Sequence, residues 1–332
     1  MITSQAVDAT SDRAAAALLL AVDAGGSKTS AWFAIASQSD APTVLGRGRS
    51  SSANPLTVGF AEATRAIAEA ADQARNEAGQ PTARVDRAVL SIAGAADAAI
   101  RDQFLDWARA NELAERVAVV PDVLSVLAAG AVDCCGVALV VGTGSVALAR
   151  NRAGRTARRG GWGYLLGDDG SGYAIGRAAT RYALEHLESA AASTSRVAER
   201  VSQALDAQSV ATLTAAIYQS TNPRATVASL APIVLEAAAG GDAAALTIVE
   251  SAARDLADLA ARAAQTIGLT EEPVSVAAAG GVIVGSTLLQ DRLRAELNQV
   301  GMPCELRIVE EPLHGCVRLA TREFAGLEIV WR

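Results

Sequence analysis

The segment from Arg159 to Gly172, near the middle of the chain, combines residue types that can form a ligand site. Its fourteen residues include six glycines, the aromatic Trp162, and the neighbouring carboxylates Asp168 and Asp169. The glycines allow positive φ angles and let a ligand approach the backbone closely. A flexible linker has no use for a tryptophan, whose large apolar surface stabilises a structure only when it is covered. The segment therefore predicts a binding site, and the rest of the chain must identify its ligand.

A second candidate site follows the first apolar run. Leu18–Val22 has the continuous apolar character of a buried strand, and it leads through Asp23–Thr29 into a second strand at Ala31–Ile35. The tip of this hairpin offers backbone N–H groups, two hydroxyls and a carboxylate, which together can bind a phosphate. It is not a Walker loop, because that motif requires a helix after its glycines. An ordinary hairpin turn capped by Asp23 fits the same residues equally well.

The pattern of buried strand, glycine turn and returning strand recurs. Gly136–Val141 is apolar and runs into Gly142–Ser145 before another strand, which indicates two related halves. Gly142–Ala147 also matches a dinucleotide fingerprint, but that fingerprint needs a helix after the glycines, so the hairpin is the better interpretation. A third turn of this kind, Gly280–Gly281, follows a later strand.

Asp122 comes directly after the apolar strand Val117–Val120 and opens a short helix. Ligands of sheets flanked by helices collect at the carboxyl ends of the strands, so this carboxylate is a candidate catalytic group. Aspartate is also a favoured helix cap, which explains most aspartates in this position. Position alone leaves both roles open.

The composition is that of a globular protein. A length of 332 residues exceeds one core of ordinary size and favours two domains, while 51% hydrophobic and 20% charged residues provide for an ample core. The formal net charge is −7, and no run of Lys or Arg could follow a phosphate backbone. Nucleic acid is therefore not an expected partner.

The cysteines and the apolar runs indicate the cellular compartment in which the protein is expected. The four cysteines show no metal-ligand spacing and favour reduced thiols in a cytoplasmic protein: Cys134, Cys135, Cys304 and Cys316. Ala14–Val22 is not a signal peptide, because Asp23 follows where a small-residue cleavage site should lie. No other apolar run reaches the length of a membrane span, so we expect no membrane contact. We expect residues 1–17 to be a disordered extension.

The order of the elements predicts an α/β protein. The first part of the chain reads as β-β-β-α-β-α-β, which implies a mixed sheet with helices packed on it. Helical spacing of apolar residues then predicts helices at Tyr173–Leu187, Arg196–Leu205, Val210–Tyr218, Thr226–Ala239 and Ala243–Ile267. We expect an N-terminal domain at 18–132, a C-terminal domain with helical insertions at 133–316, and a terminal helix in 317–332 that packs back on the first domain.

Taken together, these motifs resemble those of the BadF/BadG/BcrA/BcrD-type ATPases, and the closest likeness is to N-acetylglucosamine kinases. The resemblance runs from Leu18 to Phe324. Asp23–Thr29 is similar to the first phosphate motif, D-G-G-G-T-K-T, and Gly142–Ser145 to the second, while Gly280–Gly281 resembles the adenosine turn. Gly160–Gly172 is similar to the sugar loop G-G-W-G-x-x-x-G-D-E-G-S-G, which is long and specific enough to identify the family.

The resemblance implies a fold and a set of site residues. The fold is two actin-like (ribonuclease H-like) domains, each a mixed five-stranded sheet flanked by helices, with a cleft between them. Asp122 falls at the catalytic base and Asn54 at a sugar-binding asparagine, and Asp23 would hold Mg²⁺ through water. The sugar loop would hold the hexose through Gly161, Trp162, Gly163 and Asp168. ATP would be bound by Gly25, Gly26, Ser27, Lys28, Thr29, Gly142, Thr143, Gly144, Ser145, Gly280 and Gly281.

Three positions depart from the family motifs. Ala24 replaces a glycine and Ser27 a threonine, which keeps a small residue and a hydroxyl. Asp169 replaces a glutamate and shortens the side chain, so no role is assigned to it.

The activity that the resemblance implies is transfer of a phosphoryl group from ATP to the 6-hydroxyl of an amino sugar, with Asp122 taking the proton. N-acetylglucosamine is the first candidate substrate, and glucosamine and N-acetylmuramic acid are alternatives. A homodimer is expected on the same ground. Two other classes stay open: an ATPase activator of a 2-hydroxyacyl-CoA dehydratase, which needs a cysteine-bound iron–sulfur cluster, and a sugar sensor without catalysis.

Overall fold

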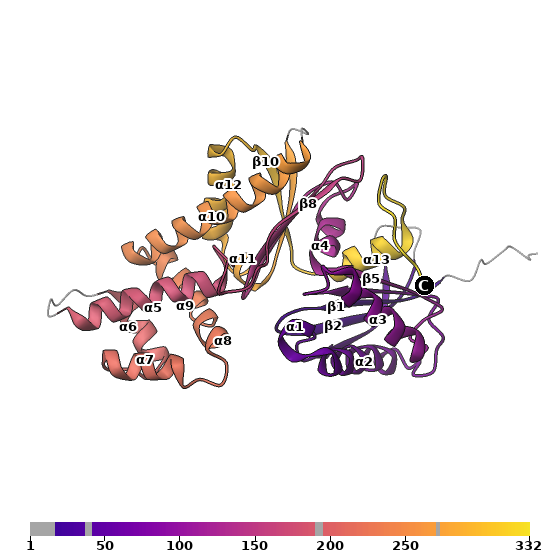
Figure 1. Ribbon diagram of the computed structural model, residues 1–332, viewed down its shortest axis with the longest axis horizontal. Coiled ribbons are helices and arrows are strands. Elements are labelled where there is room, and N and C mark those ends of the chain that lie inside the picture. The colour runs from indigo at the N-terminus through magenta and orange to yellow at the C-terminus, as the bar shows by residue number, and fades with distance from the viewer. Residues whose placement is uncertain (1–16, 37–41, 190–194, 270–272) are drawn as a thin grey trace, which may run out of the picture.

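The computed structural model describes residues 17–36, 42–189, 195–269 and 273–332. The extension predicted to be disordered, 1–17, lies outside the described residues except for Ala17. Two lobes lie side by side, and each is built on a five-stranded sheet flanked by helices (Figure 1). The predicted α/β class with two mixed five-stranded sheets is confirmed.

The first lobe contains the sheet of order β3-β2-β1-β4-β5. Its strands are β1 (Leu18–Ala24), β2 (Thr29–Ile35), β3 (Thr43–Ser50), β4 (Arg87–Ile92) and β5 (Arg116–Pro121). β1 pairs antiparallel with β2 and parallel with β4, so β1 is central and buried, as its apolar run predicts. Helices α1 (Pro55–Val58), α2 (Phe60–Glu77) and α3 (Ala98–Ala110) complete the lobe.

The alanine-rich face of α2 packs directly on the backbone of β3. The glycines of β3 make this possible, because a Cβ built on Gly48 would lie 1.8 Å from the carbonyl oxygen of Ala70, and one on Gly46 would lie 2.1 Å from that of Ala74. No side chain fits at either glycine. This contact fixes the outer part of the first sheet.

The second lobe repeats the topology of the first. Its strands are β6 (Gly136–Val141), β7 (Ser145–Arg150), β8 (Thr156–Gly160), β9 (Val274–Ala279) and β10 (Cys304–Val309). β6 pairs antiparallel with β7 and parallel with β9, as β1 does with β2 and β4. The matching directions support two related halves. β8 was not predicted, because Thr156–Gly160 is a polar edge strand with little apolar alternation.

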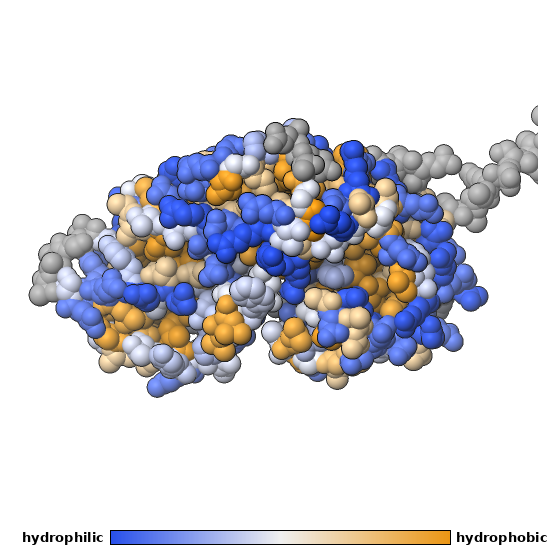
Figure 2. Space-filling model, turned by 45° about the horizontal axis from the view of Figure 1, so that its top comes forward, coloured by the Kyte–Doolittle hydropathy of each residue, from blue (hydrophilic) through white to orange (hydrophobic). Residues whose placement is uncertain are grey.

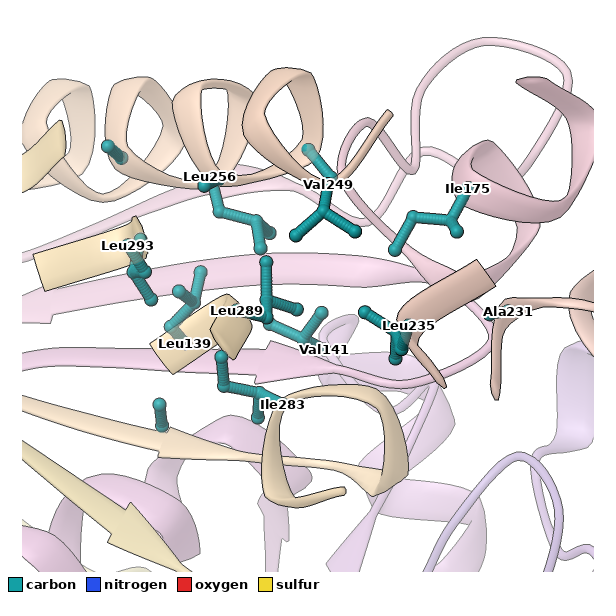
Figure 3. Close-up of a cluster of buried hydrophobic side chains, with 14 of the residues drawn as sticks. Leu139, Val141, Ile175, Ala231, Leu235, Val249, Leu256, Ile283, Leu289 and Leu293 are labelled. Carbon is teal, nitrogen blue, oxygen red and sulfur yellow. The ribbon is translucent and has the colours of Figure 1, made fainter. Parts of the chain in front are cut away.

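A group of helices packs in one core with one face of the second sheet. The helices of this lobe are α5 (Gly172–Glu188), α6 (Arg196–Ala204), α7 (Val210–Tyr218), α8 (Pro223–Ala228), α9 (Ala231–Ala239), α10 (Ala243–Ile267), α11 (Gly281–Val284) and α12 (Thr287–Gln299). Leu256 of α10 and Leu289 and Leu293 of α12 converge with Leu139 and Val141 of β6 in a dry core (Figure 3). The core holds the carboxyl end of β6 in a fixed position.

One predicted helix is two helices. Thr226–Ala239 was expected to be continuous, but α8 ends at Ala228 and α9 begins at Ala231. Pro232 lies in the first turn of α9. Proline lacks the N–H that a continuous helix would need there and clashes with the preceding turn, so the helix restarts at this point.

Helices α4 (Asp122–Gly130) and α13 (Leu313–Thr321) pack against each other between the two sheets. A Cβ on Gly315 of α13 would lie 1.8 Å from the carbonyl oxygen of Ser125 in α4, so the two helices touch backbone to backbone. α13 begins at Leu313, so the expected domain boundary after residue 316 falls inside it. α13 contacts β1 and β4, and the last residue, Arg332, exchanges two backbone hydrogen bonds with Val117 of β5.

Across the described parts of the chain, no single helix is long and apolar enough to cross a membrane, although the bent pair of 223–239 and 243–267 reaches the required length and composition together. A notch separates the two lobes along one edge of the molecular surface, with apolar residues on both of its rims (Figure 2).

Candidate functional site

The turn between β1 and β2 is fixed to the segment that carries Asn54. The Gly25 N–H donates to the Lys28 carbonyl at 2.9 Å and closes the turn, and the Ala53 N–H donates to the Gly25 carbonyl at 3.2 Å. The Asn54 side chain caps α1 by accepting from the Leu56 N–H at 3.0 Å. The structure therefore places Asn54 next to the first glycine turn.

Gly94 is a residue of this region that the sequence analysis missed. It follows β4 with a φ of 85°, and a Cβ there would lie 2.5 Å from Oδ1 of Asn54. A side chain at position 94 would displace the asparagine, since both the φ angle and the space require glycine. The only signal in the sequence is a glycine directly after a buried strand, which is also typical of an ordinary turn.

Asp122 is the first residue of α4, at the carboxyl end of β5. Pro121 occupies the cap position, and the Asp122 carboxylate accepts only from the adjacent Val123 N–H, at 2.9 Å, among the hydrogen bonds of the described residues. The Ser125 hydroxyl donates to the Asp122 carbonyl at 2.7 Å and accepts from the buried Ser91 hydroxyl at 2.8 Å. The carboxylate is thus positioned by the backbone of α4 without the usual side-chain cap of a helix.

The electrostatic environment of Asp122 joins the two lobes. Burial raises the pKa of Asp122 above its ordinary value, while the Val123 N–H and the Arg158 guanidinium oppose that rise. Arg158 belongs to β8 of the second lobe, so its charge reaches a carboxylate of the first lobe. A raised pKa makes a carboxylate a stronger base, which suits a group that accepts a proton near neutral pH.

The turn between β6 and β7 lies against two other segments. The N–H groups of Gly172 and Tyr173, at the start of α5, donate to the carbonyls of Gly142 and Thr143 at 2.9 and 3.2 Å. Gly280 has a φ of 105°, and a Cβ there would lie 2.4 Å from the carbonyl oxygen of Val141. The structure brings the second glycine turn, the third turn and the end of the loop Gly160–Gly172, here called the Trp162 loop, together at one edge of the sheet.

Asp168 faces the second glycine turn from the Trp162 loop. It is 3% exposed, with a φ of 61°, and its carboxylate accepts from the Ser145 N–H at 3.3 Å. A Cβ on Gly144 would lie 2.8 Å from both carboxylate oxygens. The Ser145 hydroxyl adds a bond to the Asp169 carbonyl at 2.7 Å. Asp168 therefore fastens the loop to the turn.

Arg224 of α8 is the second residue that the sequence analysis missed. Its guanidinium donates to the Asp168 carboxylate at 3.1 Å and lies over the Tyr164 ring, 5.6 Å from the centroid. The pair spans 56 positions of the chain, and no sequence pattern connects them. The helical insertion thus helps to hold the Trp162 loop.

The outer part of the loop is uncovered. Trp162 is 66% exposed, and Leu165 and Leu166 are 79% and 78% exposed. Large apolar side chains that gather on one exposed loop indicate a surface that another group covers. By contrast, two pockets of about 210 and 320 Å³ lie away from this loop, one beside Cys135 and Glu305 and the other between α5 and α10.

The match to known proteins decides the family. Residues 20–302 fit the sequence model of the BadF/BadG/BcrA/BcrD ATPase family. The chain belongs to this family. The predicted resemblance is confirmed, and the site lies within an ATPase fold.

Two characterised relatives of this family member are sugar kinases. The N-acetylmuramic acid/N-acetylglucosamine kinase of Clostridium acetobutylicum is 30% identical over 237 residues, which are 71% of this chain and 77% of that protein. The N-acetyl-D-glucosamine kinase of Dictyostelium discoideum is 32% identical over 163 residues, 49% of this chain and 51% of that protein.

Solved structures share the fold of this ATPase family member. A Chromobacterium violaceum protein, provisionally assigned as an N-acetylglucosamine kinase, has a TM-score of 0.71 and 23% identity, with 92% of this chain and 99% of that chain covered. A ROK family glucokinase from Streptomyces griseus, in complex with glucose and AMPPNP, has a TM-score of 0.52 and 19% identity, with 90% and 97% covered. The predicted actin-like sugar-kinase fold is confirmed.

In this BadF-type chain, Asp23 is subject to the charges of two other carboxylates. Burial and the neighbouring carboxylates of Asp122 and Glu311 raise its pKa to about 7, against the opposing effect of Lys28. Between the ordinary value of 3.8 and about 7, the folded chain holds a proton that the unfolded chain releases. The stability that this group contributes is therefore present below pH 3.8 and is lost as the pH rises through 7.

We expect Asp23→Asn to remove this pH dependence. The variant should melt at a higher temperature than the wild type at pH 8, and the gain should disappear at pH 4, where the wild-type side chain is already protonated. Thermal unfolding without nucleotide measures it, with Asp169→Asn as a control on an exposed carboxylate. A gain of equal size at both pH values would contradict the charge environment described here.

Proposed function

We propose that this protein is an ATP-dependent kinase that phosphorylates the 6-hydroxyl of an amino sugar, with N-acetylglucosamine as its substrate and Asp122 as general base. Both curated relatives are kinases of N-acetylated amino sugars, which supports the substrate class. Glucosamine and N-acetylmuramic acid are the alternative substrates.

The position of Asp122 is the observation that carries the proposal. Its carboxylate opens α4 at the carboxyl end of β5, on the lobe that also carries the first glycine turn and Asn54. Phosphoryl transfer needs alignment of the reactants and neutralisation of charge, with little covalent help from the protein. A base at this position accepts the proton of the attacking hydroxyl, while the two glycine turns present backbone N–H groups to the phosphates. Closure of the lobes would exclude water.

The charges around Asp23 fit a Mg²⁺ site. The carboxylates of Asp122 and Glu311 each repel that of Asp23, and a divalent cation relieves that repulsion. Among the residues that the structure describes, no three His, Cys, Asp or Glu side chains could ligate one ion together. This agrees with Mg²⁺, which is held by one or two carboxylates, waters and substrate phosphates. When bound, Mg²⁺ neutralises charge on the β- and γ-phosphates; Asp23 would hold it through water.

The cysteines argue against an electron activator. Cys134 is buried and adjacent to Cys135 directly before β6, whereas a cluster held between subunits needs cysteines at the surface where the subunits meet. The adjacent Cys135 cannot supply a cluster alone. Retention of Asp23, Asp122 and both glycine turns argues against a sugar sensor that has lost catalysis.

A coupled assay of ADP release tests the proposal. We expect sugar-dependent ADP formation with ATP, Mg²⁺ and N-acetylglucosamine, and much less with glucose or without sugar. Parallel reactions with glucosamine and N-acetylmuramic acid rank the three amino sugars. Release of ADP at the same rate with and without every sugar would make the protein an ATPase and overturn the proposal.

Trp162→Ala should raise the KM for the sugar about tenfold, or about 1.4 kcal/mol of binding free energy, with a smaller change in kcat. The indole ring offers the apolar face of the loop to the sugar ring, and it is 66% exposed, so its removal should not affect folding. Steady-state kinetics measure the change. Tyr218→Ala is the matched control, because Tyr218 is an 81% exposed aromatic residue on α7. An unchanged KM would move the sugar site elsewhere.

A further inference from the structure

Arg158 is a cation of the second lobe that the proposed reaction does not use. It lies on β8, two residues before the Trp162 loop begins, and its side chain is exposed. Its guanidinium reaches the Gly161 carbonyl at 3.5 Å, and a Cβ on Gly161 would lie 2.3 Å from Nη2. Gly161 has a φ of 68°, a conformation that favours glycine, and the missing side chain lets the guanidinium lie against the backbone of this residue.

The alternation of the strand directs Arg158 and Arg159 to opposite faces. Arg159 donates to the Thr266 hydroxyl of α10 at 2.8 Å, on the face where Ala157 also joins the helical core. Successive side chains of a strand point to opposite sides, so Arg158 points away from α10. That side of the sheet faces α4, because Leu148, the β7 partner of Arg158, packs against the cluster that contains Val123 and Leu127 of α4. Asp122 opens the same helix, and the Arg158 charge acts on its carboxylate.

No carboxylate of the described residues forms an ion pair with Arg158, whereas Arg152 and Arg224 of the same lobe are paired with Asp133 and Asp168. Closure of the lobes over a neutral sugar would take this charge out of water without an ion-pair partner. A desolvated guanidinium without a partner is costly, and a carboxylate that it can grip with two hydrogen bonds is its best complement.

We propose that Arg158 binds a carboxylate carried by the sugar, so that the site accepts an acidic amino sugar such as N-acetylmuramic acid, in which a lactate ether replaces the 3-hydroxyl. The inference rests on the proposed function, since it assigns the sugar to the space between Asp122 and the Trp162 loop. In the proposed function the phosphates of ATP are bound by the two glycine turns and Lys28, while Arg158 contacts the carbonyl of Gly161, the second residue of the Trp162 loop.

Equilibrium binding separates this inference from the proposed function. Calorimetry with N-acetylmuramic acid, N-acetylglucosamine and a non-hydrolysable ATP analogue is carried out on the wild type, Arg158→Gln, Arg158→Lys and the control Arg159→Gln. We expect Arg158→Gln to raise the ratio of the Kd for N-acetylmuramic acid to that for N-acetylglucosamine at least about tenfold. Arg158→Lys should restore part of the ratio, and Arg159→Gln should leave it unchanged. The wild-type Kd for the acidic sugar should also rise with salt.

Three results would overturn the inference. The wild type could fail to bind N-acetylmuramic acid; Arg158→Gln could weaken both sugars equally; or it could weaken the ATP analogue about as much as the acidic sugar, which would assign Arg158 to the phosphates. The proposed function is judged separately by wild-type turnover of N-acetylglucosamine. If the acidic sugar binds through Arg158 but no sugar is turned over, the carboxylate site at Arg158 is supported and the proposed kinase activity is contradicted.

Discussion

Asp122→Asn should lower kcat at least about a hundredfold, because a positioned general base contributes about 10²–10⁴ in rate. The amide keeps the shape and the hydrogen bond from the Val123 N–H but cannot accept the proton of the hydroxyl. Binding of ATP and of the sugar should persist, so the loss should appear in kcat and equally in kcat/KM. Stopped-flow or coupled assays with purified protein give both constants.

The stability of Asp122→Asn provides the control for this prediction. Burial raises the pKa of Asp122, so ionisation of this side chain is unfavourable in the folded protein. A neutral asparagine should therefore leave the melting temperature at pH 8 unchanged or raise it. Near-normal turnover of a well-folded Asp122→Asn variant would remove Asp122 from the role of base, and loss of sugar binding would make it a binding residue instead.

The second large effect concerns the pair of Asp168 and Arg224. Asp168→Ala should lower the free energy of unfolding of the second lobe by about 3 kcal/mol, since removal of one partner of a buried ion pair leaves the other unpaired. The Asp168 side chain is 3% exposed and that of Arg224 is 26% exposed, so Asp168 is the more deeply buried of the two charged groups. Chemical denaturation measures the change.

A double-mutant cycle tests the coupling directly. Arg224→Ala should destabilise the protein by a similar amount, and the double variant should lose less than the sum of the two single losses. Asp169→Ala is the matched control, because this neighbouring carboxylate is exposed and its change should stay within about 0.5 kcal/mol. Additive losses in the double variant would show that the ion pair does not hold the Trp162 loop.

Local patterns in the sequence predict much of this fold. The apolar runs that became β1, β6 and β9 are buried on both faces of their sheets, and each ends in a glycine turn at the edge where the candidate site lies. The motif of the Trp162 loop predicts the family and the fold because it is long and its residue types are specific. Both predictions are confirmed. The roles given to individual site residues remain predictions.

The sequence does not predict features that depend on contacts between segments far apart in the chain. β8 is polar, and it is a strand because it pairs with β7, whose own position is set by β6. Gly94 is required by the Asn54 side chain, and the partner of Asp168 lies in a helical insertion. A sequence shows which residue is unusual, but it does not show which distant residue makes it necessary. Asp168 illustrates this, since its carboxylate faces the second glycine turn and Arg224 as well as the loop that it was predicted to serve.

The most direct test of the proposed activity is identification of the product. Purified protein is incubated with ATP, Mg²⁺ and N-acetylglucosamine, and the mixture is followed by ³¹P NMR with correlation to the sugar protons. We expect one new phosphomonoester signal that correlates with the two protons on C6, formed in step with ADP and at least about a hundredfold more slowly with Asp122→Asn. A phosphate on another carbon, or inorganic phosphate as the only product, would contradict the proposed activity.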